Sequence, residues 1–170
     1  AVSMLVSLGI IEGKPDGSYA PTENVDRAQM AKMLSVIMNK GVDNSALYQS
    51  VNSGLVDVNT NWAKGHINYC YTTGIIAGRG NGKFDPSATV TALEAAKMLL
   101  VAVGYDPKIE GFEGADWAIN VSVRADEQGI FEGFTKDLSA PLNRDDAALL
   151  IYNALDVEMI QSYTTNNYPI

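Results

Sequence analysis

A motif that occurs three times constrains this chain more than any other feature. Segments 9–34, 74–100 and 129–151 each contain a Gly-Ile pair, a turn, a proline, a helix-capping residue and an apolar helical run, in the same order. Recurrence of this kind indicates one structural unit used three times. We therefore predict a repeat protein.

The repeats are expected to pack into one compact body. Each is too small to fold alone, whereas 170 residues with 46% apolar content can bury a real core. Trp62 and Trp117 each open a helical pattern twelve residues before a Gly-Ile pair, and the equivalent position in the first copy falls before residue 1. We therefore expect the chain to begin inside a repeat. The predicted division is 1–42 (repeat 1, truncated), 43–104 (connector and repeat 2), 105–161 (repeat 3) and 162–170 (irregular tail).

Composition argues against several functional classes. The net charge of -8, from 20 acidic and 12 basic residues, provides no basic face for a nucleic acid. No apolar run is long enough to insert into a membrane. Cys70 is the only cysteine, so no intrachain disulfide is possible, and its apolar neighbours predict a core position.

The second helix of each copy has a clear start signal. Asp26, Thr91 and Asn143 are good N-cap residues. Three positions later stand Gln29, Glu94 and Asp146, from which a capping box reaches back. Before these helices, Asp-Gly and Asn-Gly pairs predict tight turns at Gly17 and Gly82. Glycines after the preceding helices predict left-handed C-terminal caps.

Helix physics does not explain Arg27 and Arg144. Both stand at the first helical position, where the macrodipole disfavours a cation by about 0.3–1 kcal/mol. One interpretation is an anion site in which free backbone N–H groups and a guanidinium hold a carboxylate or phosphate. The other is an ion pair with Asp26, Asp145 or a carboxylate of a neighbouring repeat. The second copy has Ala92 instead.

These elements together resemble the S-layer homology (SLH) domain family. The resemblance rests on Leu-Val-Asp-Val at 55–58, Trp-Ala at 62–63, Gly-Ile-Ile-x-Gly at 9–13 and 74–78, Asp-Gly-Ser-Tyr-x-Pro at 16–21 and Val-Asp-Arg-Ala-Gln at 25–29. It covers nearly the whole chain. It implies a mainly α fold in which three helical repeats form a pseudo-threefold bundle with grooves between neighbouring repeats.

The resemblance also implies a function. SLH domains anchor surface-layer and other exported proteins to the bacterial wall by binding secondary cell-wall polysaccharide, often through a pyruvate ketal, so the expected location is the cell surface. The family's motif positions correspond here to Arg27, Arg144, Asp57, Trp62, Trp117, Gly17, Gly82, Gln29 and Glu94. Capping explains Gln29 and Glu94 equally well, a turn explains the two glycines, and a core role is an alternative for both tryptophans. Because the copies differ, we expect one or two competent grooves.

Other functions have weaker support. An enzyme would need a positioned nucleophile or base, and nothing marks one near His66, the single histidine. Gly78, Gly80 and Gly82 lack the strand and following helix of a phosphate-binding loop. The turns lack the ligand pattern of a calcium loop. Taken together, these points lead us to expect no catalytic residue, metal or cofactor. An assembly module that self-associates in a surface lattice without binding polysaccharide stays open as the alternative.

Overall fold

The computed structural model describes residues 5, 13 and 19–170 of the chain. Five α-helices and one 3-10 helix lie within them: α2 (Arg27–Met38), η1 (Ser45–Tyr48), α3 (Lys64–Thr72), α4 (Ala92–Ala102), α5 (Trp117–Glu127) and α6 (Arg144–Ala154). The β-type pairing in this part of the chain consists of isolated bridges. The predicted mainly helical fold is therefore confirmed.

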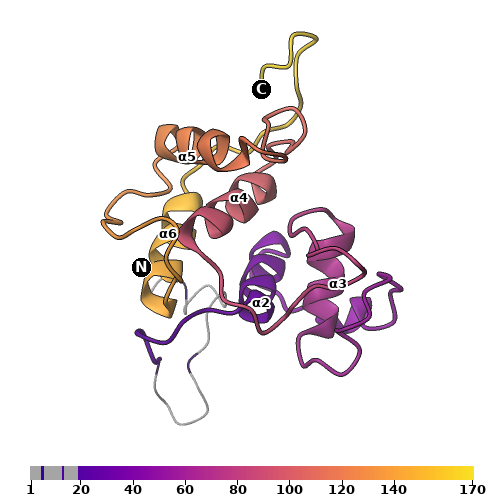
Figure 1. The fold of residues 1–170 in the computed structure, drawn as a ribbon. Coiled ribbons are helices and arrows are strands. Elements are labelled where there is room, and N and C mark those ends of the chain that lie inside the picture. The colour runs from indigo at the N-terminus through magenta and orange to yellow at the C-terminus, as the bar shows by residue number, and fades with distance from the viewer. Residues whose placement is uncertain (1–4, 6–12, 14–18) are drawn as a thin grey trace.

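Three helices form the centre of the bundle and two flank it. Helix α4 packs between α2 and α6, while α3 packs against α2 and α5 against α4 (Figure 1). The central helices carry the apolar faces that the sequence spacing predicts, and their core side chains include Leu34, Leu99 and Ile151. Cys70 on α3 is fully buried and its thiol donates to the Ala31 carbonyl, which confirms the predicted core position.

A closed ring of backbone hydrogen bonds ties together the starts of the three central helices. Val25 N–H donates to the Leu142 carbonyl, Leu142 N–H to the Val90 carbonyl, and Val90 N–H to the Val25 carbonyl, at 2.9, 2.7 and 3.2 Å. Each of these residues directly precedes an N-cap, and all three side chains are buried. The ring gives corresponding positions of the three copies the same contacts, as a pseudo-threefold bundle requires. The ring does not mark where one repeat ends and the next begins, so the division into residue ranges stays a prediction.

The same ring corrects one detail of the motif. Pro21 and Pro86 each stand four residues before a ring residue, as expected from the aligned turns. Pro141 stands directly before the ring residue Leu142 and forms a β-bridge to the N-cap residue Thr91. In the other two copies, the residues directly before the ring residue are Asn24 and Thr89, and each likewise forms a bridge to an N-cap residue. Pro141 is therefore not the counterpart of Pro21 and Pro86, because the third copy is shorter before its helix.

The helix caps follow the prediction closely. Asp26 with Gln29 and Thr91 with Glu94 form complete capping boxes. In the third copy, the Asn143 side chain accepts from Asp146 N–H, whereas the Asp146 carboxylate binds Lys136 at 2.6 Å, so α6 has the forward half of the box. All three start signals therefore work as helix caps.

Outer segments also match the sequence in most places. Gly74 and Gly129 adopt φ of 81° and 74°, the left-handed conformation predicted for C-terminal caps. Asn81 and Gly82 adopt φ of 55° and 72°, as a tight turn of the primed type needs. The predicted tail contains no regular strand, yet it folds back through a Tyr163–Pro169 bridge and projects from the bundle (Figure 1).

Candidate functional site

A cleft of about 430 Å³ opens beside Arg27, and we call it the Arg27 cleft. It lies where the start of α2, the loop after α3, helix α4 and the start of α5 come together. The residues that line it are Arg27, Ile75, Ile76, Ala77, Gly78, Arg79, Glu94, Lys97, Met98, Phe112, Glu113, Gly114 and Trp117. The motif residues of two copies and the tryptophan of a third therefore meet at one place.

Arg27 is a buried cation in the wall of this cleft. Its side chain is 3% exposed, its Nε donates to the Phe84 carbonyl at 2.8 Å and its Nη2 donates to the Ala77 carbonyl at 2.6 Å. The guanidinium also stacks on the Phe84 ring, 4.5 Å from the centroid. Burial, with a smaller contribution from nearby Arg79, lowers the pKa of Arg27 to about 10. It stays protonated at neutral pH in a site that would gain from an anion.

The predicted role of free N–H groups at the helix N-termini is wrong. The first two N–H groups of α2 and of α6 donate to carbonyls of another copy: Arg27 to Ala88, Ala28 to Pro86, Arg144 to Glu23 and Asp145 to Pro21. The third group of each helix is bound by the N-cap side chain. Neighbouring repeats therefore use the donors that an anion would have needed, and side chains must supply the binding groups.

Arg144 is held in the way that Arg27 is held. Its Nε donates to the Tyr19 carbonyl at 2.7 Å, its guanidinium lies 4.8 Å from the Tyr19 ring centroid, and the Tyr19 hydroxyl donates to the Arg144 carbonyl at 2.8 Å. Seven residues before each N-cap stand Tyr19, Phe84 and Lys136. Each arginine therefore stacks on the aromatic residue at this position of another copy. In the remaining pair, Ala92 stands in place of the arginine and Lys136 in place of the aromatic residue, so both members are replaced.

Two further cations line the Arg27 cleft, and sequence reasoning missed both. Arg79 is 39% exposed and its Nη2 lies 3.3 Å from Glu94 Oε2. Lys97 Nζ lies 5.9 Å from the centroid of the Trp117 ring. Lys97 follows Glu94 by three positions on α4, so it projects from the same helix face and could have been found by that spacing. No signal in the sequence shows that Arg79 pairs with Glu94.

The other predicted site residues have different positions. Asp57 lies outside the cleft, where its carboxylate accepts from Phe84 N–H and Asp85 N–H at 2.8 to 3.1 Å. Burial opposes ionisation of Asp57, but these hydrogen bonds outweigh it and lower its pKa. Gly82 lies in the turn beside it, and Gln29 caps α2. Gly17 is outside the described residues.

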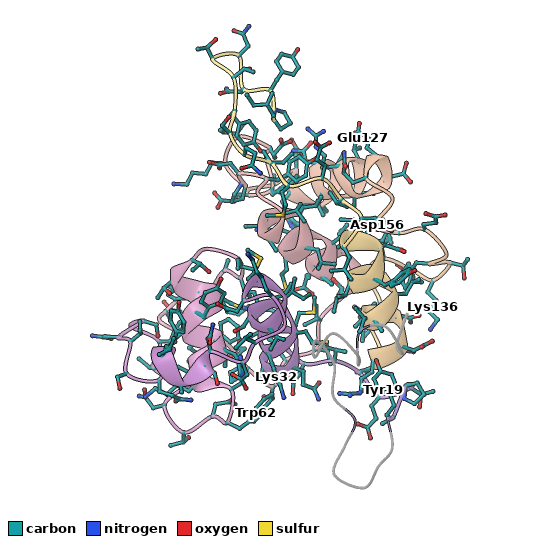
Figure 2. The ribbon with its side chains drawn as sticks, turned by 180° about the vertical axis from the view of Figure 1, so that it is seen from behind. Tyr19, Lys32, Trp62, Glu127, Lys136 and Asp156 are labelled. Atoms are coloured by element: carbon teal, nitrogen blue, oxygen red, sulfur yellow. The ribbon has the colours of Figure 1, made fainter. Side chains whose placement is uncertain are left out.

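The two tryptophans differ in exposure. Trp117 is partly buried against the core and forms part of the cleft. Trp62 is 59% exposed and lies at the periphery of the molecule, just before α3 (Figure 2). The core alternative therefore does not apply to Trp62.

The features considered for other chemistries have structural roles here. His66 is buried and its Nδ1 lies 3.1 Å from the hydroxyl of Ser35 on α2, so it joins two helices. Within the described residues, no group of His, Cys, Asp and Glu could hold a metal ion. None of the helices in this part of the chain is long and apolar enough to cross a membrane.

The fold and the cleft together define a class of protein, a helical repeat module that presents a cation-lined cleft between its repeats. Comparison with known families agrees, because residues 1–31 and 56–96 match the model of the S-layer homology domain. The chain therefore belongs to the S-layer homology domain family.

Curated relatives include surface proteins and an enzyme. The chain is 32% identical over 162 residues to a cell surface protein of Thermoanaerobacter kivui, covering 95% of this chain and 20% of that protein. It is 32% identical over 111 residues to the S-layer protein EA1 of Bacillus anthracis, covering 65% of this chain and 12% of that protein. An amylopullulanase of Thermoanaerobacterium thermosulfurigenes is 30% identical over 169 residues, covering 91% of this chain and 9% of the enzyme.

The chain thus spans a fifth or less of the length of these three relatives. A segment shared by surface proteins and an enzyme is a module common to proteins of different activity. The family and the names of the relatives indicate an extracellular location at the cell surface or wall, as the resemblance predicted.

Proposed function

We propose that this module is non-catalytic and anchors an exported protein to the bacterial cell wall by binding a carboxylate-bearing secondary cell-wall polysaccharide, with pyruvate ketals as the recognised groups. The observation that carries the proposal is the Arg27 cleft, where a desolvated guanidinium and two further cations surround a space of about 430 Å³. Membership of the SLH family supports the same function.

The cations of the cleft suit a carboxylate. The side-chain hydrogen bonds of Arg27 use Nε and Nη2, so Nη1 has no protein acceptor within the described part of the chain. A ligand carboxylate would accept a charge-assisted hydrogen bond there and would offset the desolvation of the guanidinium. Arg79 and Lys97 would add charge from the loop and from α4.

The other walls suit a sugar. Trp117 offers an aromatic surface on which the apolar face of a pyranose can stack, and Phe112 and Met98 extend the apolar lining. Gly114 leaves room for a ligand to approach the backbone closely, because nothing lies within 4 Å of the place that a Cβ would occupy there. A carboxylate on a sugar ring would therefore meet cations and an aromatic face together.

Calorimetric titration with purified secondary cell-wall polysaccharide, with and without its pyruvate groups, tests the proposal. We expect binding that depends on pyruvate and that falls at least tenfold in the double variant Arg79→Gln with Lys97→Gln. The matched control is Lys40→Gln with Lys108→Gln, which changes the net charge equally at exposed positions outside the cleft. The control should bind as the unmodified chain does.

Each other outcome has a definite meaning. Binding that is indifferent to pyruvate keeps the anchor but contradicts the carboxylate chemistry. Equal loss in both double variants shows a non-specific effect of net charge. Absence of polysaccharide binding together with self-association favours the alternative, an assembly module of a surface lattice.

A further inference from the structure

Glu94 has an unusual position for a residue in an anion-binding cleft, because it places a negative charge on the cleft wall. Its side chain is 26% exposed and lines the Arg27 cleft. Its two oxygens have separate partners within the described residues: Oε1 accepts from Thr91 N–H at 3.1 Å, and Oε2 pairs with Arg79 Nη2. The first contact caps α4 and the second holds a cation that a ligand could use.

The charge of Glu94 is not needed for the cap. Gln29 has the same place in the capping box of α2, where its Oε1 accepts from Asp26 N–H at 2.9 Å. The chain itself therefore shows that a neutral amide completes this box. Gln29 is not part of the cleft lining, whereas Glu94 is. The negative charge of Glu94, which the cap does not require, therefore acts on the cleft.

That effect is on electrostatics. A ligand carboxylate that approaches Arg79 must share the guanidinium with Glu94, and two carboxylates repel one another through a few ångströms. A carboxylate also has more acceptor sites than Thr91 and Arg79 use, so Glu94 can accept a hydrogen bond from a ligand hydroxyl or amide N–H. Glu113 adds a second acid to the same lining.

We propose that Glu94 determines the selectivity of the Arg27 cleft: it weakens the capture of a bare carboxylate and favours a saccharide that carries a hydroxyl or amide donor beside its carboxylate. This inference rests on the proposed function, because it assumes that the cleft binds such a saccharide. The cleft then recognises a combination of charge and donor groups, which distinguishes a wall polymer from the free organic acids and inorganic anions around the cell.

Two probes that differ in donor groups test this inference. One is the methyl glycoside of a mannose that carries a cyclic pyruvate ketal, which has a carboxylate and hydroxyls. The other is pyruvate dimethyl ketal in its carboxylate form, which has the same charge but no donor. Nuclear magnetic resonance titration would follow the Trp117 indole N–H and the Arg79 Nε–H, since both side chains line the cleft.

Glu94→Gln should tighten binding of the dimethyl ketal by about three- to tenfold, the size expected when one like charge at close range is removed. Binding of the glycoside should change less, so the preference of the cleft for the glycoside falls. Arg79→Gln in the Glu94→Gln background should remove the gain. Glu158→Gln makes the same change of net charge at an exposed position outside the cleft and should have no effect.

Failure of the inference and failure of the proposed function give different results. If the unmodified chain binds the glycoside and Glu94→Gln changes neither affinity, or weakens both, Glu94 does not set selectivity while the cleft remains a saccharide site. If neither the unmodified chain nor Glu94→Gln binds the glycoside, the carboxylate-binding function itself is wrong. Thermal unfolding of Glu94→Gln should match the unmodified chain, because Gln29 shows that the cap survives.

Discussion

Replacement of Arg27 by alanine gives the sharpest test of how the bundle is held together. The two physical effects of this change have opposite signs. Arg27 occupies the first position of α2, where a cation opposes the macrodipole, so alanine should stabilise the isolated helix by about 0.3–1 kcal/mol. The sequence alone therefore predicts a variant that loses ligand binding without losing stability.

The contacts of Arg27 reverse that prediction. Alanine removes the hydrogen bonds to the Phe84 and Ala77 carbonyls and the stacking on the Phe84 ring, and the Phe84 ring is fully buried. Hydrogen bonds from a charged group contribute about 1.5–3 kcal/mol each, and stacking of a cation on a ring about 0.5–2 kcal/mol. Relief of the desolvation that lowers the pKa of Arg27 offsets part of this loss. We expect a net destabilisation of about 2–4 kcal/mol.

Urea unfolding followed by far-ultraviolet circular dichroism measures this value, and thermal unfolding should show a midpoint lower by several degrees. Arg27→Met is the matched variant, because it keeps most of the side-chain volume and removes only the polar contacts. It should lose most of the same stability. An Arg27→Ala variant as stable as the unmodified chain, or more stable, would refute the clamp that we assign to this residue.

Two further predictions concern the loop before α3 and the first turn of α3. Asp57→Asn should lower the thermal unfolding midpoint near neutral pH, but by less below about pH 4. A carboxylate with a lowered pKa stabilises the fold above its unfolded pKa and loses that effect as pH falls through its folded pKa. The unfolding midpoints of both proteins between pH 3 and 7 measure this pH dependence, and a difference that stays constant over that range would contradict the prediction. Gly65→Ala should destabilise the chain by about 1–3 kcal/mol although alanine is the better helix former, because its Cβ would overlap the Ser45 carbonyl of η1. A more stable Gly65→Ala variant in urea unfolding would show that η1 yields easily.

Local signals in the sequence predict the helices well. The three N-caps are all in place, and Gly74 and Gly129 end their helices in the left-handed conformation. These features depend on residues within one turn of each other, so one sequence contains the information needed.

The roles of the arginines could not be predicted in this way, because their partners are distant. Arg27 donates to Phe84, which is 57 positions away, and Arg144 donates to Tyr19, which is 125 positions away. An arginine at the first helical position is unfavourable when the helix is considered alone. Only the neighbouring copy supplies the carbonyl and the ring that compensate for its cost.

The pairing of arginines with aromatic residues is visible only across the copies. When positions are counted back from the N-caps, the copy of Arg27 has Tyr19, the copy of Ala92 has Phe84 and the copy of Arg144 has Lys136, so the sequence matches only one arginine to an aromatic residue of its own copy. In the structure each arginine stacks on one of these aromatic rings. The pairing explains the joint replacement, since an aromatic residue at 136 would have no guanidinium to cover it and a second cation beside Lys136 would repel it.

The same contacts relate stability to binding in the Arg27 cleft. Phe84 and Ala77 fix the guanidinium before any ligand arrives, so a carboxylate that binds at Nη1 meets a cation that is already oriented and partly desolvated. The cost of burying Arg27 is thus met by the folding of the repeats, and a bound anion would relieve part of it. A ligand of this kind binds the folded chain in preference to the unfolded one and must therefore stabilise the fold. Under the proposed function, the residue that joins two repeats is thereby also the one whose charge the ligand would satisfy.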